Sequence, residues 1–331
     1  MRAPRSRENG VALITILLVV VIATVLGVAM VRDQNMMILK ARNFFNQSQA
    51  RQYALGGEEL ARQILWQDFQ EDLKKDHLLE DWAEQEMQFD FEDGEVRIQI
   101  DDMQGRLNVN SLASSSPSGA QARVRFINLF AEVGIDLVYV DRIADWIDAD
   151  TNVRPMGAED FEYLGLDRPY RTGGQMMVDI TELRLLLDMD REIYQQLLPY
   201  VTALPDPETE LNINTAEAIV LQTVSRELQL EVAQQLAVIR DETEGFNTVN
   251  EFLQLPELAG MGISAQGLGV QSAFFRVRST AIFQERFSYL TSIVQRDLID
   301  GSTTVIYRNY SKKILPIVKT EDDEAEDSSD G

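Results

Sequence analysis

The chain contains no cysteine and only one histidine among its 331 residues. Disulfide bonds and thiolate chemistry are therefore excluded. A Ser–His–Asp triad or a histidine-based zinc site would have to use His77, which lies in a polar segment without either signature. We expect His77 to be an ordinary surface residue. Because no Gly-x-Ser-x-Gly motif is present either, an anchored hydrolase is poorly supported, and the sequence predicts a protein that is not an enzyme.

Basic residues are also scarce: 30 Lys and Arg oppose 54 Asp and Glu, for a net charge of −24. Binding to nucleic acid needs a basic surface that neutralises phosphates, so this balance argues against a nucleic-acid partner. Acids dominate residues 321–327. We expect residues 320–331 to form a disordered, solvated tail.

Charge is missing altogether from residues 11–31, which are almost entirely apolar. At about 1.5 Å per residue they would form a helix of roughly 31 Å, enough to cross the hydrocarbon core of a bilayer. Arg2, Arg5 and Arg7 precede this run, and positive residues resist translocation, so we expect a cytoplasmic N-terminus. The alternative is a secretory signal peptide cleaved near residues 28–30, although such peptides have a shorter apolar stretch.

The glycine before this run indicates how the N-terminus is processed. A basic leader that ends in Gly10, directly ahead of an apolar helix, resembles the class III signal of type IV pilins and type II secretion pseudopilins. The resemblance implies that prepilin peptidase cuts between Gly10 and Val11 and methylates the new N-terminus, leaving a helix for the core of a filament. A plain single-pass anchor on a helical stalk is the alternative.

The apolar run also lacks the acid that most pilins carry. In that family a Glu at the fifth mature position neutralises the N-terminal amine of a neighbouring subunit, whereas the fifth residue after Gly10 is Thr15. A carboxylate in apolar surroundings is costly unless it is paired. The absence resembles one branch, minor pseudopilin K of the type II secretion system. A subunit without the acid cannot bind the amine of a subunit above it, which suits the tip of a filament.

The rest of the chain predicts an α+β fold. Residues 33–72 favour a helix, in which Gly56-Gly57 marks either a bend or a close contact with a sheet. Alternation of apolar and polar residues predicts strands at 94–102, 274–283, 287–294 and 303–310, with helices between the first strand and the others. We therefore expect a pilin-like long N-terminal helix packed on an antiparallel sheet, with an inserted all-α domain. The expected parts are a leader (1–10), a transmembrane or filament-core helix (11–31), a stem helix with the first strands (32–110), the inserted domain (111–270), the C-terminal strands (271–319) and the acidic tail (320–331).

The insertion contains an internal repeat. Residues 107–111, Leu-Asn-Val-Asn-Ser, are echoed by Leu-Asn-Ile-Asn-Thr at 211–215, each ahead of a helix. The pattern looks like two helix-hairpin-helix or SAM-like repeats, with residues 114–119 as the linker into the insertion. Because such repeats often bind DNA, a membrane-anchored DNA-uptake receptor is the main alternative function. The hairpin candidate at 257–262 is imperfect and its surroundings are acidic, which favours a module for subunit contacts.

The densest group of acids has the spacing of a calcium loop. If Asp148 is position 1, then Asp150 is position 3, Asn152 is position 5 and Glu159 is position 12. Calcium prefers such oxygen ligands, and a flexible loop can bring them together. Position 6 is Val153 instead of the glycine of an EF-hand, so the spacing alone leaves a bare solvated loop as an alternative.

The same region extends the resemblance to nearly the whole chain. The segments Asp-Trp-Ile-Asp-Ala-Asp (145–150), Gly-Ala-Glu-Asp (157–160) and Val-Asp-Ile-Thr-Glu-Leu-Arg (178–184) are similar to the signature of pseudopilin K, whose inserted domain carries calcium. The resemblance implies a structural calcium ion whose candidate ligands are Asp145, Asp148, Asp150, Asn152, Glu159 and Asp160. Residues 169–175 lack the asparagine expected there, which leaves a second calcium site open.

The resemblance also implies a place in the cell and a set of partners. It predicts a single-pass protein of the bacterial inner membrane, with the C-terminal domain in the periplasm, that initiates the type II secretion pseudopilus at its tip. The implied partners are minor pseudopilins I and J, then pseudopilin H, the major pseudopilin G and prepilin peptidase. The secretin and secreted cargo are further candidates.

Overall fold

The computed structural model describes residues 8–71 and 74–311 of the chain. The first seven residues of the predicted leader and the whole predicted acidic tail lie outside these ranges.

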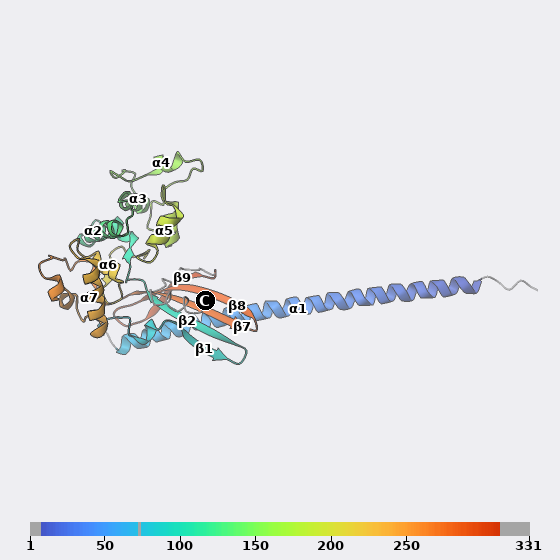
Figure 1. The fold of residues 1–331 in the computed structure, drawn as a ribbon. Helices are drawn as coiled ribbons and strands as arrows, with labels where there is room; N and C mark the ends of the chain where they lie inside the picture. The colour runs from blue at the N-terminus through green and yellow to red at the C-terminus, as the bar shows by residue number, and fades with distance from the viewer. Residues whose placement is uncertain (1–7, 72–73, 312–331) are drawn as a thin grey trace, which may run out of the picture.

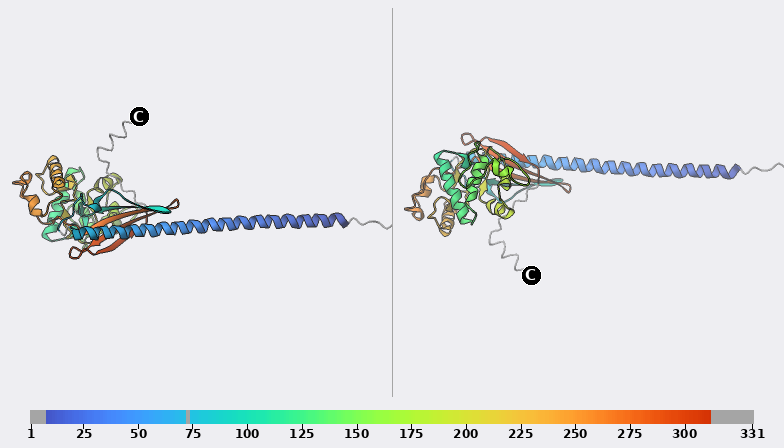
Figure 2. Two further views of the ribbon diagram at one scale, coloured as in Figure 1. Left: turned by 90° about the horizontal axis from the view of Figure 1, so that it is seen from below. Right: turned by 90° about the horizontal axis from the view of Figure 1, so that it is seen from above.

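The first described element is one uninterrupted helix, α1 (Glu8–Glu71), of 64 residues. It contains no proline, which accounts for its continuity over this length. Every side chain from residue 12 to residue 45 is exposed, and this part of α1 extends away from the globular head as a bare rod (Figures 1 and 2). Among the described residues, α1 is the one helix that is long and apolar enough to cross a membrane.

The head contains a five-stranded antiparallel sheet in the order β1-β2-β7-β8-β9. Its strands are β1 (Met87–Phe91), β2 (Gly94–Asp102), β7 (Phe274–Phe283), β8 (Arg286–Arg296) and β9 (Thr303–Asn309). The structure confirms the four predicted strands, and each strand end lies within two residues of its predicted position. The edge strand β1 was not predicted, although Met87, Phe89 and Phe91 alternate with polar residues.

The last third of α1 covers one face of this sheet through small residues. Ala54, Ala61 and Leu65 are fully buried against strand residues such as Ile98. A Cβ atom at Gly57 would lie 2.3 Å from the Ser279 hydroxyl, a distance that no real side chain could adopt. The close helix–sheet contact expected at Gly56-Gly57 is therefore confirmed for the second glycine, because only its missing side chain lets α1 approach the sheet.

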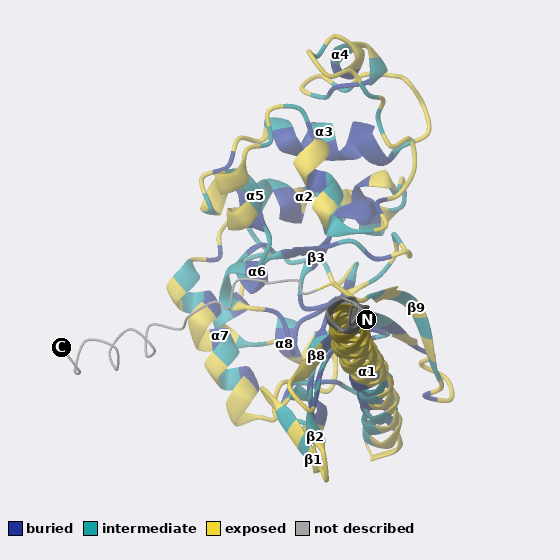
Figure 3. Cartoon of the chain, turned by 90° about the vertical axis from the view of Figure 1, so that its right-hand side faces the viewer, coloured by how far each residue is buried: buried dark blue, intermediate teal, exposed yellow. Residues whose placement is uncertain are grey.

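The segment between β2 and β7 forms a separate helical layer with its own hydrophobic core. It stands beyond the sheet, with α4 at its far end (Figure 3). Its longer helices are α2 (Pro117–Glu132), α3 (Val138–Ile147), α5 (Arg191–Leu197) and α7 (Leu230–Glu242). Its shorter elements are α4 (Asp160–Leu164), α6 (Ala218–Gln222), α8 (Val249–Leu253), the two-residue strands β3 to β6 and several 3-10 turns. Of the predicted linker 114–119, residues 117–119 instead form the first turn of α2, which Ser116 caps, and only 114–116 lie outside a helix.

The internal repeat of the sequence has a structural counterpart in two short parallel pairs. Strand β3 (Leu107–Asn108) pairs with β4 (Val201–Thr202), and β5 (Leu211–Asn212) pairs with β6 (Leu268–Gly269). After each first strand a buried asparagine holds the backbone of a distant residue. Asn110 bonds both the N–H and the carbonyl of Met177, and Asn214 does the same with Phe246. Each asparagine thus satisfies buried backbone groups that helices and strands leave unpaired.

Candidate metal centre

Helix α3 and the start of α4 bring three carboxylates together at the far end of the helical layer. Asp145 lies on the last turn of α3 and is fully buried, and Asp148 follows the last residue of that helix. The intervening loop returns to place Glu159, which is 4 % exposed, immediately before α4. One oxygen from each of these three side chains lies within 4.8 Å of the other two. Spacing of three residues on a helix, followed by a returning loop, is what creates this group.

The loop is fastened to α3 through its backbone. The N–H of Arg154 donates to Oδ2 of Asp145 at 3.1 Å, and the N–H of Met156 donates to Asp141 at 3.1 Å. At Gly157 an added Cβ would stand 1.7 Å from Oδ2 of Asp145, so only glycine lets the loop pass this close to the carboxylate. Position 157 therefore requires glycine, because any side chain there would collide with the Asp145 carboxylate.

The carboxylates of this group are only partly compensated. The Arg154 side chain contacts Asp145 at 2.5 Å and also contacts Asp148. Oδ1 of Asp148 and Oε1 of Glu159 are buried and accept no hydrogen bond from any residue that the structure describes. Buried acceptors without a partner are costly, so two oxygens of the group still require a cation or donor.

The electrostatics of the group agree with this deficit. Burial, followed by the negative charges of Asp145, Asp148 and Asp150, raises the pKa of Glu159 to about 7. Burial also raises the pKa of Asp145, against the opposing effect of Arg154. The folded chain therefore holds more negative charge here than its own groups stabilise.

Three other predicted ligands lie outside this group of three. Asp150 accepts hydrogen bonds from the backbone and side chain of Asn152, at 2.7 and 2.8 Å, in the exposed part of the loop. Asp160 accepts from the backbone and the hydroxyl of Thr172 and pairs with Arg171 at 3.3 Å. Asp150 and Asp160 would therefore have to change these contacts to bind the same ion as Asp145 and Glu159.

The arrangement fits a hard divalent cation. Three carboxylates supply the oxygen ligands that calcium prefers, and two of their oxygens are buried without a partner in the part of the chain that the structure describes. No residue from 148 to 159 has a positive φ, so the loop does not make the turn of an EF-hand despite the similar spacing. Asp145, Asp148 and Glu159 are the residues that would hold the ion.

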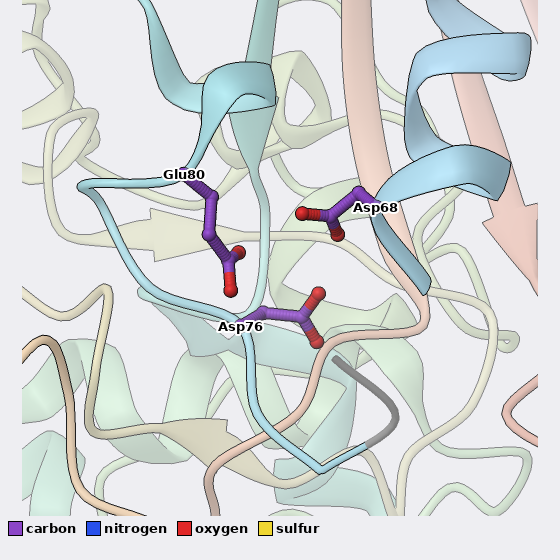
Figure 4. Close-up of side chains that lie close together, drawn as sticks. All are labelled: Asp68, Asp76 and Glu80. Carbon is purple, nitrogen blue, oxygen red and sulfur yellow. The ribbon is translucent and has the colours of Figure 1, made fainter. Parts of the chain in front are cut away.

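A second group of three acids lies where α1 meets the sheet: Asp68, Asp76 and Glu80, whose carboxylates point toward one another (Figure 4). Arg296 of β8 is 1 % exposed, bonds Asp68 at 3.3 Å and contacts Asp76. Burial and the neighbouring acids raise the pKa of Asp68 to about 8, although Arg296 opposes this shift. Burial raises the pKa of Glu80 to about 7. This group joins the end of α1 to the sheet.

Sequence reasoning missed the second group because the arginine that joins its acids lies far from them along the chain. Arg296 is separated by 228 residues from Asp68 and by 220 from Asp76. The expectation for His77 was also wrong: its side chain is 12 % exposed, and its Nε2 lies 3.4 Å from Glu80. Local sequence carries no signal for either contact, because both depend on how β8 and the end of α1 pack.

Comparison with known proteins places these features in a family. Family models described as "Type II secretion system (T2SS), protein K" match residues 105–206 and 211–271. A type II secretion system protein K from Pseudomonas aeruginosa is 35 % identical over 97 % of this chain and 98 % of its own length. The chain belongs to the type II secretion system protein K family.

Other members and a solved structure agree with this assignment. The protein K of Klebsiella pneumoniae is 35 % identical and covers 76 % of this chain and 81 % of its own length. A chain in the crystal structure of the GspK–GspI–GspJ complex from enterotoxigenic Escherichia coli superposes with a TM-score of 0.73 at 26 % identity. The match covers 83 % of this chain and all of that one, and it confirms the predicted α+β fold. The chain is therefore a minor pseudopilin of type II secretion, a family of structural subunits.

Proposed function

We propose that this protein K family member forms the tip of a type II secretion pseudopilus and initiates its assembly for protein export. The observation that carries the proposal is α1, whose exposed, charge-free segment 12–31 continues without interruption into the head. Such a rod of apolar side chains requires a bilayer or the matching helices of other subunits, because water cannot stabilise it.

Thr15 supports the proposed direction of stacking. Its hydroxyl donates to the carbonyl of Ala12 at 2.9 Å, so it is satisfied within its own helix. A neutral, internally bonded side chain offers no charge to the N-terminal amine of a subunit stacked above. The helical layer stands beyond the sheet (Figure 3), and its bulk would obstruct the addition of a subunit above it. Both features suit the last position of a filament.

The partners are proposed from the family. Minor pseudopilins I and J would pack their N-terminal helices against α1, followed by pseudopilin H and the major pseudopilin G, with the secretin or cargo facing the helical layer. To test this, the full-length chain is co-expressed in membranes with I and J of the same secretion system. We expect the three to co-purify in detergent. Recovery of I and J as a pair without this chain would contradict the proposal.

The N-terminus supplies an independent test. Prepilin peptidase is proposed to act from the cytoplasmic side of the inner membrane and to cut between Gly10 and Val11, with the head in the periplasm. Replacing Gly10 with Asp is expected to leave the leader attached, because a side chain at the cleavage position blocks the peptidase. N-terminal sequencing of the purified wild-type protein should begin at Val11. A start at any other residue would reject the prepilin assignment.

Calcium is proposed as a structural ion at Asp145, Asp148 and Glu159, with Asp150, Asn152 and Asp160 as further candidates. The proposal is supported by the two buried oxygens that have no partner among residues 8–71 and 74–311. When bound, the ion would neutralise the carboxylates and fix the loop between α3 and α4. We expect a chelator to lower the melting temperature of the full-length protein in detergent. An unchanged melting temperature, together with no calorimetric binding, would reject the calcium site.

A further inference from the structure

The Arg154 side chain reaches into the same carboxylates that are proposed to hold calcium. One nitrogen, Nη1, contacts both Asp145, at 2.5 Å, and Asp148. We propose that Arg154 is an intramolecular counter-ion that competes with calcium, so that its guanidinium has to leave the two aspartates before the ion can bind them. The inference rests on the calcium site proposed above and concerns how that site is regulated.

The contacts of Arg154 are divided in a way that allows this exchange. Its backbone is part of the fixed loop, since its N–H donates to Asp145 at 3.1 Å and its carbonyl accepts from Gly157 at 3.0 Å. Its side chain is 32 % exposed and borders solvent. The guanidinium can therefore swing into water while the loop keeps its position, and no core packing has to open.

The two cations would satisfy different parts of the group. Arg154 covers one oxygen of Asp145 and one of Asp148, while Glu159 Oε1 and the other oxygen of Asp148 have no hydrogen-bond partner among the described residues. An ion with ligands at about 2.4 Å lies between oxygens separated by at most about 4.8 Å, which is the limit that these three carboxylates meet. Calcium therefore reaches all three acids, whereas Arg154 contacts only two of them.

Competition has a definite thermodynamic consequence. Breaking the Arg154 contacts opposes binding, so the observed affinity for calcium is lower than the affinity of the carboxylates alone. When calcium is scarce, however, the positive charge of Arg154 compensates the negative charges of Asp145 and Asp148. Removal of the side chain should separate these effects, since it strengthens calcium binding and weakens the calcium-free fold.

The test compares Arg154→Met with Arg168→Met in the full-length protein in detergent, by calorimetric titration with calcium chloride. Each change removes one positive charge near the acidic loop. Arg168 lies in the loop after α4 and is exposed, and no ion pair joins it to a candidate ligand among the described residues, so it controls for a general change of charge. We expect Arg154→Met to tighten binding by roughly 5- to 150-fold, the usual range of coupling between two sites, and Arg168→Met to change it little. Arg154→Lys, which keeps a cation at the same place, should lie close to the wild type.

Each outcome separates this inference from the calcium proposal itself. Equal affinities for Arg154→Met and the wild type would overturn the competition while leaving the calcium site intact. Equal gains for the two Met variants would overturn it as well, because general charge would then suffice. If no variant binds calcium, both proposals fail. If Arg154→Met unfolds in chelator, a larger rise of its melting temperature on adding calcium measures the same competition.

Discussion

The two three-acid groups of this protein have the same composition and opposite construction. At α3 and α4, one arginine that is 32 % exposed contacts Asp145 and Asp148 but not Glu159, and two oxygens of the group have no described partner. Around Arg296, which is 1 % exposed, the guanidinium bonds Asp68 and Asp76 and also the carbonyl of Ser272 at 2.8 Å.

The two groups have the same number of acids, and they differ in whether the carboxylate oxygens have hydrogen-bond and ion-pair partners. Glu80 accepts from the indole N–H of Trp82 at 2.5 Å and from the backbone of His77 at 3.1 Å, and Asp76 accepts from the N–H of Ser272 at 2.7 Å. The second group therefore already contains its cation and its donors. The first group retains buried acceptors that a divalent ion would satisfy.

The largest expected effect breaks the Arg296 group. Arg296→Met should destabilise the full-length protein by about 3–5 kcal/mol, because it leaves buried acids without their cation. The matched change Arg154→Met, measured in calcium, should cost far less, since the ion replaces the guanidinium. Thermal and denaturant unfolding in detergent provide the measurement. Similar losses for both variants would show that the two arginines serve the same structural purpose.

A smaller effect is expected from removing the proposed ion. At a calcium concentration about 100 times its Kd, binding contributes about 2.7 kcal/mol, which a chelator should abolish. The double variant Asp148→Asn with Glu159→Gln should lose this response. Asp68→Asn is the control, and its response to calcium should equal that of the wild type. Loss of the calcium response in Asp68→Asn would relocate the ion to the second group.

The smallest effect concerns pH. The pKa of Asp68 is about 8 in the folded chain, against an ordinary value of 3.8, mainly because of burial. The folded chain then keeps a proton that the unfolded chain loses between about pH 4 and pH 8, so the free energy of unfolding falls as pH rises through this window. Asp68→Asn stays neutral, and between about pH 7 and pH 8 it should reduce that fall by about 1 kcal/mol. The exposed control Asp93→Asn should leave the fall unchanged. Parallel pH profiles for the wild type and Asp68→Asn would show that Arg296 keeps Asp68 ionised.

Prediction from sequence succeeded where the physics is local or periodic. Alternation placed β2, β7, β8 and β9, and the charge-free run placed the exposed part of α1. The same alternation was available for β1 at Met87 to Phe91 but was not used. In the candidate metal centre, spacing brought Asp148 and Glu159 into one group. It could not tell that Asp160 faces Thr172, because that depends on where residues 169–175 fold back.

By itself, the sequence determined a proline-free helix without an acid at Thr15, a strand pattern and an acidic loop, since each depends on neighbours along the chain. Only the tertiary structure decided which acids are compensated. Arg296 reaches Asp68 across 228 residues because β8 lies under the end of α1, and Arg154 contacts Asp145 because Gly157 lets its loop pass beside that carboxylate. Electrostatic compensation acts through distance in space, and chain order does not encode that distance.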